Sequence, residues 1–308
     1  MADSADTIAV PEPRVRPWRL PRAVGLTLRF CGRKPLGAIG AVIILVLLVM
    51  AVFADRIAPH AYDESITGAR MQPPSSRFWM GTDNLARDIW SRVVYGARIS
   101  ITVGFATVAL ATLIATAIGV SSAYLGGGYD IVVQRVVDAW MSFPGLVIVL
   151  SLMAALGPGV LNLIFALSIL GAAGASRVIR GATLSTMQDP YVEAARAIGA
   201  GHLRIILRYL LPNVMATIII LATIGLGTVI LAESGLSFLG FGIPPPYPSW
   251  GGMLSGSGRS FMYYAPWMAL FPGTAISLAV FGFNMLGDAL RDVLDPRLRG
   301  AGGGALRG

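Results

Sequence analysis

The chain has few charged residues, only two histidines, and a single lysine and cysteine. Charged residues make up 13% of its 308 residues, against about 25% in soluble domains. One cysteine, Cys31, excludes an internal disulfide. The only lysine, Lys34, precedes Pro35, so the phosphate-binding pattern G-x-x-x-x-G-K-[ST] does not occur. No zinc-ligand spacing or acyl-transfer motif occurs either, which argues against an enzyme and against a cofactor bound by this chain.

What is abundant is apolar sequence. Hydrophobic residues make up 55% of the chain and its mean hydropathy is +0.69, which indicates a membrane protein. The net charge of +8 is spread in short blocks between apolar runs, as orientation signals are. No basic stripe interleaves with aromatic residues, so we expect a lipid bilayer and no nucleic acid as partner.

The apolar runs predict an all-α membrane protein with six transmembrane helices. A helix needs about 20 mostly apolar residues to cross the bilayer, and its backbone groups must be satisfied within the segment. Gly157-Pro158-Gly159 interrupts an uncharged run of 38 residues, which therefore reads as two spans. The expected spans are 36–54, 99–125, two within 139–176, 213–232, and one within 260–287 that begins near Pro266.

The distribution of lysine and arginine predicts that both termini are cytoplasmic. With that orientation the inside segments carry 17 basic residues and the outside segments carry 7. The expected parts are a cytoplasmic tail (1–35), the first span with an extracytoplasmic loop (36–98), a five-helix core (99–290) and a cytoplasmic C-terminal tail (291–308).

Two outside segments allow more than one interpretation. In "GTDNLARDIWSRVVYGARIS", we expect Asp83 to cap an interfacial helix in which Asp88 pairs with Arg92; a substrate site is the alternative. In "ESGLSFLGFGIPPPYPSWGGML", four prolines predict a stiff segment, either a cap over a cavity or a surface loop.

Ionisable residues occur only at the edges of the expected spans. They are Asp138, Glu233 and Asp288. For Glu233 we expect a helix-end carboxylate in interfacial water, with a role in the pathway or its gating as the alternative.

The longest internal cytoplasmic segment contains "EAARAIGAGHLRIILRYLLPN", from Glu193 to Asn213. Asp189 and Pro190 suit the N-cap and first position of a short helix, and Glu193 can pair with Arg196. Ala194, Ala195 and Ala197 favour a helix with little bulk.

Gly199 and Gly201 are expected to end this short helix. A second, interfacial helix is expected from about His202 to Pro212. Its apolar face, toward lipid or the bundle, would consist of Leu203, Ile206, Leu207 and Leu210. The short helix is either a docking element or a helical loop. The residue pattern alone leaves both open.

This stretch resembles the EAA loop of ABC importer permeases in Glu193, Ala194, Ala195, Gly199, Leu211 and Pro212, whereas Tyr209 departs from the aliphatic residue of many members. The two outside segments and "GDALRDVLDPRLR" are similar to the second, C-type permease of dipeptide, oligopeptide and nickel importers. The resemblance runs from about Leu36 to Arg299. It implies the type I ABC importer permease fold and an EAA coupling loop at 185–212.

The resemblance also implies a mechanism and partners. The short helix would dock into a cytoplasmic ATPase subunit and transmit its motion to the spans. A sister permease, two ATPase subunits that use ATP and Mg, and an extracytoplasmic binding protein would complete an importer in a bacterial plasma membrane. The implied ATPase-coupling residues are Asp189, Pro190, Tyr191, Glu193, Ala194, Ala195, Arg196, Ala197 and Gly199. Peptides are the expected substrate, with nickel chelates or another small solute as the alternatives. The alternative functions are an ion-coupled secondary transporter and a membrane scaffold that transports nothing.

Overall fold

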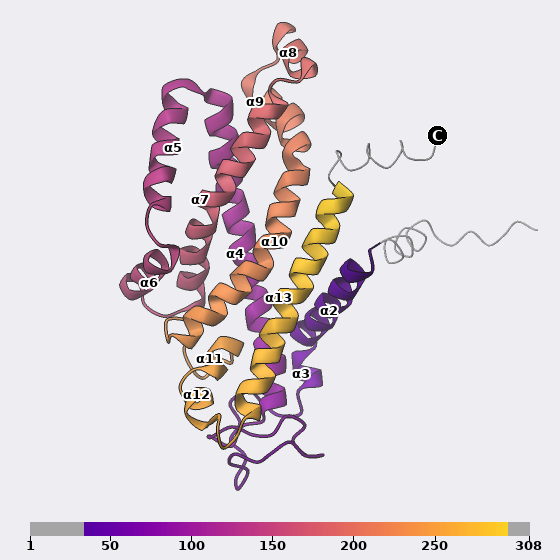
Figure 1. Ribbon diagram of the computed structural model, residues 1–308, viewed down its shortest axis with the longest axis vertical. Helices are drawn as coiled ribbons and strands as arrows, with labels where there is room; N and C mark the ends of the chain where they lie inside the picture. Colours follow the sequence, from indigo (N-terminus) through magenta and orange to yellow (C-terminus); the bar gives the residue numbers. More distant parts are fainter. Residues whose placement is uncertain (1–33, 295–308) are drawn as a thin grey trace, which may run out of the picture. The chain divides into compact units, whose positions relative to one another are not determined.

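The computed structural model describes residues 34–294, so Cys31, most of the N-terminal tail and residues 295–308 lie outside the described part (Figure 1). The described residues fold as helices joined by turns and loops. The helices are α2 (Pro35–Val52), α3 (Ala54–Ile57), α4 (Ile89–Leu125), α5 (Gly127–Met141), α6 (Gly145–Leu156), α7 (Val160–Thr186), α8 (Pro190–Ala197), α9 (His202–Ile205), the π-helix η1 (Ile206–Leu210), α10 (Leu211–Phe238), α11 (Trp250–Leu254), α12 (Ser257–Phe261) and α13 (Trp267–Leu294).

Five helical stretches in the described chain are long and apolar enough to cross a membrane. They are α2, α4, α7, the continuous stretch from α9 to α10, and α13. The bent pair of α5 and α6 forms a sixth span if the two helices are counted together. The prediction of an all-α protein with six spans is confirmed in this sense.

The third span differs from the prediction, which placed it entirely after Ala139. It is a broken helix in which α5 and α6 meet at 87° around Ser142, Phe143 and Pro144. A residue before proline is disfavoured in the helical conformation, which explains the end of α5. Charge-free runs could not reveal α5 because it carries three charged residues.

Two of the charges of α5 pair with α7. Arg180 Nε donates to Asp130 Oδ1 over 2.7 Å, and Arg177 pairs with Asp138. Opposite charges within contact distance make each group tolerable in an apolar setting. The acidic residues of α5 are therefore compatible with a helix beside α7, although they broke the apolar pattern.

Helix α4 begins ten residues earlier than predicted. Asp88, rather than Asp83, is its N-cap, with Oδ2 accepting from the Ser91 backbone N–H over 2.9 Å. Arg92 pairs with Asp83 (3.9 Å) instead of Asp88. There is thus no separate interfacial helix before the second span, because residues 82–88 form a loop and Ile89 already belongs to α4.

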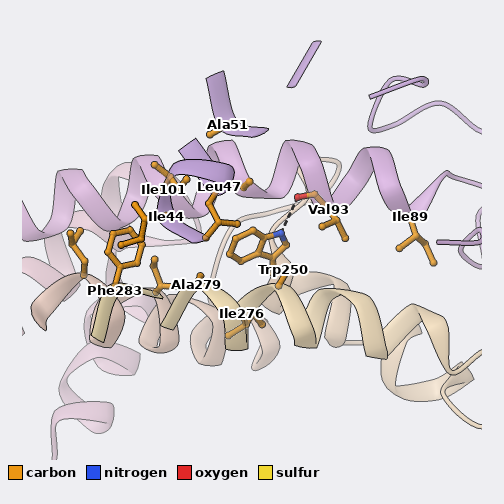
Figure 2. Close-up of a cluster of buried hydrophobic side chains, with 14 of the residues drawn as sticks. Ile44, Leu47, Ala51, Ile89, Val93, Ile101, Trp250, Ile276, Ala279 and Phe283 are labelled. Carbon is orange, nitrogen blue, oxygen red and sulfur yellow. Dashed lines mark hydrogen bonds between the residues drawn. The ribbon is translucent and has the colours of Figure 1, made fainter. Parts of the chain in front are cut away.

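A hydrophobic cluster joins α2, α4, α11 and α13 at its centre (Figure 2). Trp250 is fully buried there, and its Nε1 donates to the carbonyl oxygen of Val93 over 3.0 Å. Gly96 makes room for the indole, since a Cβ at this position would lie 2.8 Å from Trp250 Cδ1. The segment containing Trp250 is thereby anchored in the helical core.

The expected interfacial helix from His202 is continuous with the fifth span. Pro212 lies at the first turn of α10 and does not end the helix, which runs from His202 to Phe238. The π-turn of η1 immediately precedes it, and a proline inside a helix clashes with the carbonyl four residues earlier. The wider turn accommodates the proline at this point.

Candidate functional site

Helix α8 lies at one end of the described bundle, beyond the ends of α4, α7 and α10 (Figure 1). Asp189 occupies its N-cap position with extended backbone and Pro190 begins the helix, as predicted. The Asp189 carboxylate interacts with the Tyr191 hydroxyl. Burial first, and this hydrogen bond second, raise the pKa of Tyr191, which stays protonated at neutral pH.

A glycine-dependent turn ends α8. Gly199 has φ +77°, a conformation that side chains with a Cβ rarely adopt. The N–H of Ala200 donates to the carbonyl of Ala195 and the N–H of Gly199 to that of Arg196, both over 3.0 Å. These two hydrogen bonds form a Schellman motif, which satisfies the last carbonyl groups of the helix. Gly201 has φ −64° and serves as the N-cap of α9.

The inner face of α8 is fixed to the bundle. Val192 is fully buried and packs with Ile205 and Leu210. The last two are five residues apart, and the π-turn between them places both on one face. The four residues expected on one apolar face are divided between two environments. Leu210 is buried and Ile206 packs against the same cluster, whereas Leu203 and Leu207 are exposed.

The outer face of α8 is free for contact. Glu193, Ala194 and Ala197 are exposed, and Ile198 at the tip is 81% exposed. Ala194 and Ala197 have short side chains, so another backbone can approach this part of the face closely. Ala195, in contrast, is buried on the inner side.

Arg196 differs from the prediction. In the described chain it does not form the expected ion pair with Glu193, and its guanidinium lies 5.9 Å from the centroid of the Tyr124 ring. The Tyr124 hydroxyl is 2.8 Å from Nδ1 of His202. Tyr124 thus connects the end of α4 to the two helices of the EAA loop. Sequence reasoning missed this residue because it lies more than 60 positions away from the loop.

Glu233 also departs from its expected environment. It is 1% exposed, on α10, instead of lying in interfacial water. Ser237 Oγ donates to Oε1 over 2.8 Å, and Ser100 Oγ and Ser234 Oγ approach Oε2 at 3.4 Å. Ser100 belongs to α4, so the carboxyl group links two spans through hydroxyl groups.

The other two expected ionisable residues lie elsewhere. Asp138 pairs with Arg177 on α7, and Asp288 is exposed near the end of α13. Neither lies beside Glu233.

The two segments that were expected outside the membrane come together at the end of the bundle opposite α8. There they enclose a cavity of about 490 Å³. Residues 83–92 form one wall and residues 237–256, which include Pro244 and Pro245, form much of the other. The four-proline segment is therefore part of a cavity wall, as one of its two interpretations proposed.

Asp83 holds the first wall together. Its Oδ1 accepts the backbone N–H groups of Leu85 (2.8 Å) and Arg87 (2.9 Å), and its Oδ2 accepts from Arg87 Nε over 2.7 Å. Ser237 and Ser249 line the second wall. Because Ser237 bonds Glu233, the buried carboxyl group lies directly behind this wall.

Comparison with solved structures supports the fold. A chain of the MetNI methionine ABC transporter, from a crystal form described as showing inward-facing conformations, aligns with a TM-score of 0.54 and 19% identity. The alignment covers 67% of this chain and 97% of that chain. The arrangement of helices is thus that of a type I ABC importer permease.

Comparison with known sequences places the chain more closely. A dipeptide transport system permease protein of Alkalihalophilus pseudofirmus is 38% identical over 96% of this chain and 99% of its own length. A glutathione transport system permease protein of Escherichia coli is 39% identical over 87% of this chain and 88% of its own length. These relatives are transport permeases, so the chain is a membrane permease subunit rather than an enzyme.

Two family descriptions match successive parts of the chain. Residues 28–74 match the N-terminal transmembrane domain of oligopeptide transport permease C. Residues 115–300 match the inner membrane component of binding-protein-dependent transport systems, which confirms the resemblance drawn from the sequence. The chain belongs to the family of binding-protein-dependent transport system inner membrane components, as a C-type permease of ABC importers.

Proposed function

We propose that this chain imports peptides as one half of a permease pair, with ATPase subunits docked on α8. The observation that carries the proposal is the construction of α8. Its inner face is fixed by Val192, its end is fixed by Gly199, and its outer face of Glu193, Ala194 and Ala197 is exposed. A rigidly held helix with short exposed side chains suits the transmission of motion from a docked subunit. The sequence has no P-loop, so the energy of ATP must reach the spans through such a contact.

The proposed coupling loop, 185–212, contacts three spans. Met187 follows the end of α7, Leu210 leads into α10, and Tyr124 belongs to the end of α4. Movement of α8 would therefore displace α4, α7 and α10 together. The docking face of the helix consists of Glu193, Ala194 and Ala197. The residues that position the helix are Asp189, Pro190, Tyr191, Ala195 and Arg196.

The proposed orientation places α8 in the cytoplasm. The N-terminal end of α2 and the C-terminal end of α13 point toward the end of the bundle that carries α8 (Figure 1). This arrangement agrees with two cytoplasmic termini in a bacterial inner membrane. The cavity at the other end would then face the extracytoplasmic side, where a binding protein delivers the substrate. Glu233 is proposed as a pathway or gating residue, because it links α4 to α10 behind that cavity.

Peptides are the proposed substrate class. The relatives above are named for dipeptides and for glutathione, which is itself a small peptide. Their names favour peptides over nickel chelates and leave an ion-coupled secondary transporter without support.

The test is ATP-driven uptake by the complete complex in proteoliposomes. Replacing Glu193→Lys reverses the charge of the docking face, and Gly199→Val forces a branched side chain into φ +77°. Both variants should insert normally and lose most ATP-driven uptake. Gly201→Val is the matched control, since Gly201 has ordinary φ and open space around it. Normal uptake by both Glu193→Lys and Gly199→Val would refute the docking role of α8.

A further inference from the structure

The cavity between the two outside segments has the size and walls of a binding site. Its volume of about 490 Å³ lies within the range of about 300–1,000 Å³ typical of small-molecule sites. Its walls come from two parts of the chain that are more than 140 residues apart. Leu85 lines it and is 55% exposed, so the cavity opens to the surface at this residue.

The charges that line the cavity are unbalanced. The lining residues include two cations, Arg87 and Arg92, and a single carboxylate, Asp83. The carboxylate is already used by Arg87 Nε at 2.7 Å and by two backbone N–H groups. Arg92 lies farther away, with Nε at 3.9 Å from Asp83 Oδ2.

Arg92 is therefore a buried cation that shares its nearest carboxylate with Arg87. Asp63, which does not line the cavity, is a second acidic residue that acts on it electrostatically. Arg92 is 7% exposed, and its Nη1 donates to the carbonyl oxygen of Tyr62 over 2.7 Å. A guanidinium carries five N–H donors in a fixed fork that matches a carboxylate. A buried charge that is partly paired is costly, and an incoming anion would relieve that cost.

A second observation points to a polar ligand. Asn84 lines the same cavity, and its side-chain oxygen is buried without a hydrogen-bond partner among the described residues. Such unsatisfied groups are rare in folded proteins and call for a partner. The opposite wall offers the hydroxyl groups of Ser237 and Ser249.

We propose that this cavity binds a carboxylate group, with Arg92 and Arg87 as the cationic partners. Asn84 Oδ1 is an acceptor, so its partner would be an N–H group of the same ligand and not the carboxylate. The inference rests on the proposed function for the source of that group. The carboxylate would be either the C-terminus of the imported peptide or an acidic side chain of the binding protein.

The first experiment measures the electrostatic potential in the cavity and requires no uptake. In a Cys31→Ser background the chain has no cysteine, so Leu85→Cys provides a single label site at the cavity. Its rates of reaction with an anionic and a cationic methanethiosulfonate are compared in the assembled complex. The reference is Tyr263→Cys, which is outside the cavity lining and replaces a residue that is 88% exposed.

The anionic-to-cationic rate ratio should be higher at Leu85→Cys than at Tyr263→Cys, by on the order of tenfold, because a cavity lined by one sign of charge concentrates counter-ions. Arg87→Gln, added to Leu85→Cys, should lower that ratio. Equal ratios at the two cysteines would overturn the proposal. This readout is independent of ATP, so its failure is distinguishable from failure of the docking role of α8.

The second experiment identifies the source of the carboxylate by protection of Leu85→Cys from labelling. Trialanine should protect the cysteine and trialanine amide should not, if the group is the peptide terminus. Protection that requires the binding protein and is the same with either peptide would assign an acidic side chain of that protein. Absence of protection in both arms would overturn the proposal.

Discussion

Trp250 donates a hydrogen bond from its indole Nε1 to the carbonyl oxygen of Val93 over 3.0 Å, although 157 residues separate them (Figure 2). This contact fastens the segment after the four prolines to α4. Because the indole is fully buried, Trp250→Ala should lower the free energy of unfolding by about 3–5 kcal/mol. Trp250→Phe keeps an aromatic ring and should lose less, about 1 kcal/mol for the hydrogen bond plus a packing loss. Thermal unfolding of the purified complex measures both, and equal losses would contradict this account of the contact.

Gly119 lies where α4 packs closely against α7. A Cβ at this position would lie 2.6 Å from the carbonyl oxygen of Ser176, a backbone atom that cannot rotate away. Gly119→Ala should therefore separate the two helices and destabilise the protein. Gly174 on α7 has open space around it, and Gly174→Ala should be neutral or stabilise by about 0.5–1 kcal/mol. Melting temperatures that fall equally for the two variants would contradict the close packing.

The pair of Asp130 and Arg180 should stabilise the α5–α7 contact. Arg180 Nε donates to Asp130 Oδ1 over 2.7 Å, and Ser122 also bonds the carboxylate. Asp130→Asn should cost about 1.5–3 kcal/mol, as expected for a hydrogen bond to a charged group. The exchange Asp130→Arg with Arg180→Asp should recover part of that loss in a double-mutant cycle. Additive effects of the single and double variants would show that the pair contributes no coupling.

The link from α3 to α4 should depend on pH. The Arg98 guanidinium first, and the Tyr95 hydroxyl second, lower the pKa of Asp55 below its ordinary value of about 3.8. A folded-state pKa that is lowered stabilises the protein above the unfolded-state pKa, and the effect is lost as the pH falls through the folded-state value.

We therefore expect Asp55→Asn to melt slightly below the unmodified protein at pH 6–7. The two should come to melt together as the pH falls below the lowered folded-state pKa of Asp55, where the carboxyl group is protonated in both states. Since Asp55 is exposed, added salt should also reduce the difference. A difference in melting temperature that persists in strong acid would show that packing, and not the ion pair, causes the difference.

The sequence predicted the helices whose apolar runs were uninterrupted. The spans at α2, α7 and α13 followed from length and composition, and the start of α8 followed from Asp189 and Pro190. The sequence-based prediction failed where contacts with another helix compensate the cost of a charged residue in an apolar segment. Asp130 and Asp138 broke the apolar pattern of α5, yet α7 neutralises them.

Part of the candidate sites could also be predicted from the sequence. The exposed face of α8 follows from its alanines and the conformation of Gly199. The burial of Glu233 does not, because its hydroxyl partners include Ser100 on another span. The cavity required Arg92 and Ser237 to be brought together across the fold, which no local pattern encodes.

The docking of an ATPase on α8 is tested most directly by site-specific cross-linking. A photoactivatable residue placed at Glu193, which is exposed on the outer face of α8, should cross-link to an ATPase subunit in the assembled complex. The same residue at Tyr263, two residues after the end of α12, should not. Helix α12 lies at the end of the bundle opposite α8 (Figure 1). Cross-linking of the ATPase subunit at Tyr263, and none at Glu193, would contradict the account.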